Sequence, residues 1–197
     1  ALLGADNQTL YLDSEGDLLL GIGASDEVEV SGRAGLQTLA KDTAAALAQS
    51  GITSVTLPDS LRTIKDEAFR LSALTTVTLP EKFETVGTCA FCSAGKLASI
   101  DLGGTISLGG SAFESTSAKE GVNFRPELNR LTTIGDFTFS RTAVSSVTLP
   151  DSVTTVGEQA FSENTALTSF HIGAGVTSFA ETALYNDRKI ATLTVST

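Results

Sequence analysis

The stretch "SSVTLPDSVTTVGEQAF", residues 145–161, decides the fold because the chain repeats it. Nearly the same phrase occurs at 53–69 ("TSVTLPDSLRTIKDEAF") and at 75–91 ("TTVTLPEKFETVGTCAF"). Self-similarity at a period of roughly 20–50 residues is typical of solenoids, in which one small structural unit stacks on the next. We therefore predict a mainly β repeat solenoid with a ladder of parallel strands.

The phrase can be followed through residues 52–197 as six units and a truncated seventh. One unit, which contains "VNFRPELNRLTTIGDFTF", carries three inserted residues. Successive units are 22 to 25 residues apart, which is the length of a leucine-rich repeat. The expected opening positions are Ile52, Leu74, Leu97, Lys119, Val144, Leu167 and Ile190.

Each part of the phrase has an expected structural role. Side chains alternate between the two faces of a strand, so the Val and Leu of "SVTL" should point inward. A glycine follows in three units (Gly87, Gly135 and Gly157), where we expect a backbone angle that other residues resist. A short helical or 3-10 turn should come next and end in an apolar residue. These residues should stack into a spine: Phe69, Phe91, Phe113, Phe139, Phe161 and Leu184.

The outward positions of the strands should form two columns of small polar side chains on a concave strip. This strip is the candidate binding surface, although Thr and Ser also suit exposed strands for purely structural reasons. The candidate residues are Ser54, Thr56, Thr76, Thr78, Ser99, Asp101, Asn123, Ser146, Thr148, Ser169 and His171, and the columns continue through Gly121, Thr192 and Thr194.

Residues 1–51 do not carry the phrase and are expected to form an N-terminal cap on the first repeat. Residues 9–22 suggest a hairpin, and "EVEV" at 27–30 suggests another strand. The apolar spacing over about 34–49 predicts one α-helix, followed by Gly51. A small independent domain is the alternative.

The phrase "LTxVTLPxSVTTVGxxAF" resembles the BspA-like leucine-rich repeats, a class common in bacterial cell-surface proteins, over about residues 52–195. Two units depart from it, with "DLGGTISLGG" at 101–110 and "FRPELNRLTTIG" at 124–135. The resemblance implies a cell-surface or secreted location and a role in adhesion.

Charge and hydropathy exclude several partners. The net charge of −10 disfavours nucleic acid and anionic membrane surfaces, which attract Lys- and Arg-rich faces. No stretch reaches the roughly 20 consecutive apolar residues that a membrane-spanning helix needs. We expect no membrane insertion by this segment and no nucleic-acid partner.

Few residues suggest chemistry. His171 is the only histidine, and its outward strand position favours an exposed polar residue over a catalytic one. Cys89 and Cys92 form a single CxxC without a second pair, so two unpaired thiols are the favoured interpretation. A local disulfide is the alternative for an exported protein. We expect no enzymatic activity, no cofactor and no metal site.

The sequence therefore predicts a non-enzymatic interaction or adhesion module that presents its strip to a protein or glycan. The irregular loops at 114–122 and 125–131 are a second candidate surface, since loops on a rigid scaffold often carry function. The alternative function is a passive spacer within a larger surface protein.

Overall fold

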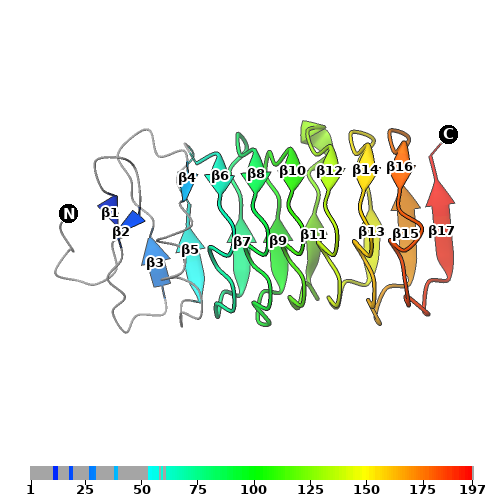
Figure 1. The fold of residues 1–197 in the computed structure, drawn as a ribbon, viewed down its shortest axis with the longest axis horizontal. Coiled ribbons are helices and arrows are strands. Elements are labelled where there is room, and N and C mark those ends of the chain that lie inside the picture. Colours follow the sequence, from blue (N-terminus) through cyan, green and yellow to red (C-terminus); the bar gives the residue numbers. More distant parts are fainter. Residues whose placement is uncertain are drawn as a thin grey trace.

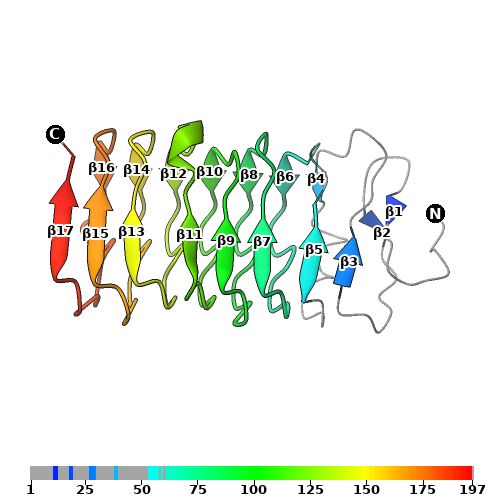
Figure 2. The same cartoon turned by 180° about the vertical axis from the view of Figure 1, so that it is seen from behind.

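The computed structural model describes residues 53–57, 59 and 61–196 with their side chains, together with the backbone of four short strands between Tyr11 and Leu39. These parts form the predicted solenoid of parallel strands. Each turn contributes two strands, so two rows of strands run along the long axis. Figures 1 and 2 show these rows from opposite sides.

The first row contains the strands of the "SVTL" segments, paired in parallel and in the predicted order. Its members are β5 (Ser54–Thr56), β7 (Thr76–Thr78), β9 (Ser99–Asp101), β11 (Gly121–Asn123), β13 (Ser146–Thr148), β15 (Ser169–Ile172) and β17 (Thr192–Val195). One strand of this row lies in each of the six predicted units and in the truncated seventh.

A second row of strands, which the sequence analysis did not predict, follows the turns. These strands form one continuous seven-stranded sheet in the order β16-β14-β12-β10-β8-β6-β4. Its members are β4 (Thr38–Leu39), β6 (Thr63–Ile64), β8 (Thr85–Val86), β10 (Ser107–Leu108), β12 (Thr133–Ile134), β14 (Thr155–Val156) and β16 (Ser178–Phe179).

The first row is divided where the second is continuous. It consists of β3-β5, β7-β9-β11 and β13-β15-β17. The division between β11 and β13 coincides with the insertion, which forms a 3-10 helix, η1 (Pro126–Leu128), between β11 and β12. The inserted residues coincide with a loss of strand pairing in the first row only, since β12 of the second row keeps its register with both β10 and β14.

The core contains the predicted phenylalanine spine. Adjacent rings of the first four members are nearly parallel, at angles of 6°, 4° and 2° and centroid distances of 5.1, 5.1 and 5.4 Å. The fifth ring follows at 5.4 Å, and Leu184 packs against the core beyond it. All five rings, of Phe69, Phe91, Phe113, Phe139 and Phe161, are at most 1% exposed.

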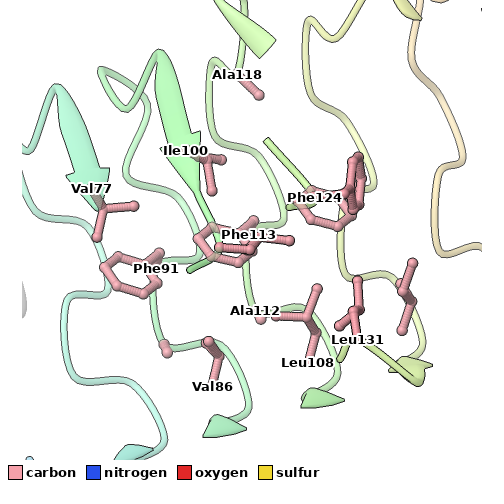
Figure 3. Close-up of a cluster of buried hydrophobic side chains, with 14 of the residues drawn as sticks. Val77, Val86, Phe91, Ile100, Leu108, Ala112, Phe113, Ala118, Phe124 and Leu131 are labelled. Atoms are coloured by element: carbon pink, nitrogen blue, oxygen red, sulfur yellow. The ribbon is translucent and has the colours of Figure 1, made fainter. Parts of the chain in front are cut away.

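The spine lies between the two rows of strands. In Figure 3 the ring of Phe91 lies between Val77 of β7 and Val86 of β8, and the same arrangement recurs in the next turn. The inward side chains of both rows therefore share one core with the spine. This explains why residues far apart in each phrase must all be apolar.

The turn before each spine residue is not the helical or 3-10 turn that the sequence predicts. Glu67 and Leu71, on either side of Phe69, have left-handed backbones with φ of 59° and 58°. As a result, the N–H groups of Glu67, Phe69 and Leu71 all donate to carbonyls of the following turn, at 2.9, 2.7 and 3.0 Å. The backbone differs from a helical turn because bonds to the next turn alternate with bonds within the turn, such as that from the N–H of Ser72 to the carbonyl of Phe69 at 3.1 Å.

The explanation given for the recurring glycine was also wrong. Gly87, Gly135 and Gly157 do not have positive φ. A Cβ on Gly135 would instead lie 2.8 Å from the carbonyl oxygen of Leu108, and one on Gly87 would lie 2.5 Å from the amide nitrogen of Asp66. The glycines are required because consecutive turns approach each other closely at this point.

One opening position was also misplaced. Lys119 is exposed, and the preceding residue, Ala118, is 0% exposed and part of the core. The strand itself, β11, starts at the expected place. A small side chain fills the core here because the backbone at Ala118 has a positive φ of 43° and hydrogen bonds to Leu97.

Near the N-terminus the backbone of β1 (Tyr11–Leu12) pairs antiparallel with β2 (Leu18–Leu19), which confirms the hairpin. β3 (Glu27–Glu29) confirms the next strand and pairs with β5. Within the expected helix over 34–49, however, Thr38–Leu39 form β4 and pair with β6. At these two residues the helix expectation was wrong, because they continue the second row; its other residues lie outside the described part of the chain.

Candidate interaction surface

The candidate binding residues lie in two straight columns wherever the strands pair. In the first paired group, Thr76 lies opposite Ser99, and Thr78 lies opposite Asp101. Asn123 continues the second of these columns. We call these columns, together with their continuation on β13, β15 and β17, the polar strip.

The second group of the polar strip repeats the arrangement. Ser146 lies opposite Ser169, and Thr148 lies opposite His171. Thr192 and Thr194 extend the columns onto β17. No strand pairing joins β11 to β13, so the structure brings the predicted residues together as two patches rather than one. Ser54 and Thr56 belong to a further pair, β3-β5.

Exposure differs within the polar strip. The exposed members are Thr56, Thr76, Thr78, Asn123, Ser146 and Thr148, whereas Ser54, Ser99, Asp101, Ser169 and His171 are partly buried. The buried residues between them, such as Val77 and Val147, are 2% and 3% exposed. The exposed hydroxyls of the strip therefore lie on strands whose inward side chains are packed in the core.

Asp101 does not present a free negative charge. Arg125 donates to both of its carboxylate oxygens, at 2.7 Å from Nε and at 2.6 Å from a terminal guanidinium nitrogen. The backbone N–H of Gly103 adds a bond at 3.0 Å. Burial alone would raise the pKa of Asp101, but these bonds and the positive charge of Arg125 together lower it.

Arg125 is a residue of this surface that the candidate set did not include. It follows β11, has a left-handed backbone with φ of 48°, and also contacts Glu127 at 3.2 Å. The loop at 125–131 was noted as a second candidate surface, and the structure shows that its first residue connects the loop to the strip. The sequence feature that could have pointed to Arg125 is the displaced proline after it, because no other unit has an arginine at the corresponding position.

A shallow depression lies beside this ion pair. It is lined by side chains and backbone of β9 and β11, including Ser99, Asp101 and Asn123, with Glu120 at its margin. Gly121 contributes no side chain to the column, and a Cβ there would meet nothing within 4 Å. The depression thus lies where the column lacks a side chain, on the last paired strands before the break.

His171 is held within the sheet by two hydroxyls. Its Nδ1 lies 2.7 Å from Oγ1 of Thr194, and its Nε2 lies 2.9 Å from Oγ of Ser196. A hydroxyl can donate or accept, so it satisfies the ring in either tautomer. A catalytic triad requires a carboxylate that orients the imidazole, and neither partner supplies one.

The two cysteines form a disulfide between Cys89 and Cys92, with 4.7 Å between their Cα atoms. The favoured expectation of two unpaired thiols was wrong. The turn that contains Phe91 brings the two residues together, because Cys92 donates its N–H to the carbonyl of Cys89 at 3.2 Å. Among the described residues there is no group of three or more His, Cys, Asp or Glu that could hold a metal ion.

Within the part of the chain that the structure describes, no helix has the length and apolar character needed to cross a bilayer.

Comparison with known families now identifies the class. The model described as "BspA type Leucine rich repeat region" matches residues 43–133 and 132–197 in 6 copies. The match covers most of the chain, so the chain belongs to this family. No match was found among curated protein sequences.

Similar folds occur among solved structures. A leucine-rich repeat protein from Bacteroides ovatus matches 74% of this chain with 24% identity and a TM-score of 0.53. A leucine rich cell surface protein from Faecalibacterium prausnitzii matches 87% of it with 19% identity and a TM-score of 0.46. The aligned part spans 44% of the first protein and 61% of the second.

Proposed function

We propose that this chain is a non-enzymatic interaction module of a cell-surface or secreted protein, which binds a protein or glycan through the polar strip. The observation that carries the proposal is the set of exposed hydroxyls held in register on paired parallel strands. Membership of the BspA-type family supports the surface location. The disulfide also fits an oxidising compartment outside the cytosol.

The chemistry of the strip suits a polar ligand. Parallel strands lie roughly 4.8 Å apart, so each column offers donors and acceptors at that interval. Exposed Thr76, Thr78, Ser146 and Thr148 can each donate one hydrogen bond and accept others. Hydroxyl groups of a glycan and the backbone of an extended peptide both complement such a surface.

The strip has few of the residues that dominate tight interfaces. Trp, Tyr and Arg are the usual anchors of binding energy, and among the described residues Arg125 is the one such side chain bonded to the strip, where it is already paired with Asp101. We therefore expect modest affinity for a single module. Adhesion would then depend on several copies that bind together.

The test is a binding screen with the purified chain against immobilised matrix proteins, mucins and a glycan array. For every ligand detected, Thr78→Lys and Thr148→Lys should each be compared with the unaltered chain, since they lie on opposite sides of the break. Both side chains are exposed. Loss of binding with one variant only would show which patch carries the ligand.

Thr88→Lys is the matched control, because Thr88 is also an exposed threonine but lies in the turn after β8 and outside the strip. It adds the same charge and should leave binding unchanged. If both strip variants bind as well as the control, the strip is not the binding surface. A chain that binds nothing in the screen would favour the spacer function.

A further inference from the structure

A column of small and polar residues runs through the solenoid three positions after each spine residue. Its members are Ser72, Ala94, Thr116, Thr142, Asn164 and Asp187, and all of them are buried. They lie where the chain leaves the turn, close to the carbonyl of the spine residue. In four of the six turns the polar side chain makes hydrogen bonds that water cannot supply at a buried site.

Two members of the column donate to a spine carbonyl, whereas Thr142 Oγ1 donates to the side-chain oxygen of Asn164 at 2.7 Å and Ser72 Oγ has no partner among the described residues. Thr116 Oγ1 donates to the carbonyl of Phe113 at 2.8 Å. Asn164 Nδ2 donates to the carbonyl of Phe161 and, at 3.0 Å, to that of Phe139 one turn earlier. The side-chain oxygen of Asn164 meanwhile accepts the backbone N–H of Thr142 at 2.7 Å.

Asp187 occupies the equivalent position one turn after Asn164. Its side chain makes the accepting contact that Asn164 makes, but not the donating ones. Its Oδ1 accepts the backbone N–H of Asn164 at 2.6 Å, as the amide oxygen of Asn164 accepts that of Thr142. Its Oδ2 is buried and has no hydrogen-bond partner among the described residues. The side chain as a whole is 9% exposed.

The register between the two turns indicates what Oδ2 faces. In Asn164 the corresponding atom is Nδ2, which donates to the spine carbonyls of its own and the preceding turn. For Asp187 the equivalent acceptors are the carbonyls of Phe161 and Leu184. An ionised carboxylate can only accept hydrogen bonds, whereas a protonated one can donate.

We propose that in mildly acidic solution the folded protein holds a proton on Asp187, and that Oδ2 donates it to the spine carbonyls as a proton-dependent fastening of the last turn. A carboxylic acid there reproduces the pattern of Asn164, with one oxygen that accepts and one group that donates. When the proton is lost, a buried charge faces carbonyl oxygens, and the turn that leads into β17 loses this fastening.

The surroundings of Asp187 favour the protonated form. Burial raises the pKa of Asp187 to about 6, the N–H of Asn164 opposes the rise, and the negative charge of Glu163 adds to it. Glu163 itself pairs with Arg141 at 2.9 Å. Arg188, the next residue in the chain, is exposed and donates to Asn186 instead.

The sign of the effect follows from linkage. An unfolded aspartate has a pKa of about 3.9, below that of the folded chain. The contribution of Asp187 to stability is therefore complete below about pH 3.9 and is lost as the pH rises through about 6. The fastening thus holds in acid and is released towards neutral pH.

The first measurement is a carbon-detected NMR titration of the side-chain carboxyls in the unaltered chain, with the Asp187 signal assigned by its loss in Asp187→Asn. Asp187 should titrate near pH 6. A midpoint at or below that of ordinary aspartates, about 3.9, would overturn the proposal. This measurement needs only the assignment from the variant, so it does not depend on how stable the variant is.

The second measurement is denaturant unfolding of the chain and of Asp187→Asn at pH 5 and pH 7.5. The asparagine keeps the donor at both pH values, so the folding equilibrium constant of the variant, relative to that of the unaltered chain, should rise about tenfold between them. A ratio that does not change with pH, or a variant that is the less stable at pH 7.5, would overturn the proposal.

Asp136→Asn is the matched control. Asp136 also accepts a backbone N–H from the next turn, that of Glu158 at 2.8 Å, but its side chain is exposed. Water can satisfy its second oxygen, so the asparagine gains nothing there. This variant should show no gain in relative stability between pH 5 and pH 7.5.

Discussion

At the scale of single residues, the spine explains why one side chain affects three turns. Each central ring stacks on the ring before it and the ring after it, so its removal leaves a cavity at two interfaces between turns. Phe113 is 0% exposed and stacks on Phe91 at 5.1 Å and on Phe139 at 5.4 Å. Stability in such an array depends on nearest-neighbour contacts.

Phe113→Ala should therefore lower the free energy of unfolding by about 3–5 kcal/mol, measured by urea denaturation. Tyr185→Ala is the control, because Tyr185 is an aromatic residue that is 59% exposed. It should change stability by less than about 0.5 kcal/mol. Equal losses in the two variants would show that the spine does not hold the turns together.

The ion pair between Arg125 and Asp101 is a second effect at this scale. Arg125→Ala should cost about 1 kcal/mol, because both side chains are partly solvated, at 29% and 21% exposure. The folded pKa of Asp101 is lowered, so its contribution is present at neutral pH and is lost as the pH falls through that pKa.

The measurement is the difference in unfolding free energy between the unaltered chain and Arg125→Ala as a function of pH. The difference should shrink as Asp101 becomes protonated. A difference that stays constant down to pH 2 would mean that the cost of the substitution has another origin, such as the backbone of the inserted loop.

At the scale of elements, three sets of hydrogen bonds join consecutive turns: the paired strands of the first row, those of the second row, and the turns around the spine. The second row and the turns continue past the insertion, whereas the first row does not. The continuous sets require close approach of the backbones, and Gly87, Gly135 and Gly157 lie where a Cβ would contact the backbone of the preceding turn.

Gly135→Ala should cost about 1–3 kcal/mol, because its Cβ would lie 2.8 Å from the carbonyl oxygen of Leu108 and 2.9 Å from Gly109. Thermal unfolding of the variant tests this. Gly95→Ala is the control, since a Cβ there meets nothing within 4 Å. That substitution should be neutral or stabilising by up to about 1 kcal/mol.

At the scale of the whole molecule, β17 forms one end of the described solenoid and pairs only with β15. Leu193 lies opposite the buried Phe170, and Val195 lies opposite Ile172, so both continue inward columns. They are nevertheless 55% and 61% exposed. An unpaired strand edge beside exposed apolar side chains favours association.

We expect the purified chain to associate in a concentration-dependent way that the double substitution Leu193→Glu and Val195→Glu reduces. Analytical ultracentrifugation over a range of concentrations would measure this. Thr76→Glu and Thr78→Glu together add the same charge at exposed positions elsewhere and serve as the control. If both double variants reduce association equally, net charge rather than the end of the solenoid is responsible.

Much of the fold could be predicted because the phrase repeats six times. Alternation in "SVTL" predicts which side chains point inward, and the recurrence of phenylalanine predicts the spine. The outward columns follow from the same alternation, and the pairing of Thr78 with Asp101 confirms their register. A periodic sequence must place equivalent residues at equivalent positions, so these features need no knowledge of long-range contacts.

Other features depend on how one turn meets the next, and the tertiary structure alone decided them. The left-handed turn residues, the close approach at Gly135 and the second row of strands are products of hydrogen bonds between turns. The bond of Arg125 to Asp101 depends on where an inserted loop lies against its neighbours. Local alternation carries no information about such contacts, because they are formed by residues about one full repeat apart.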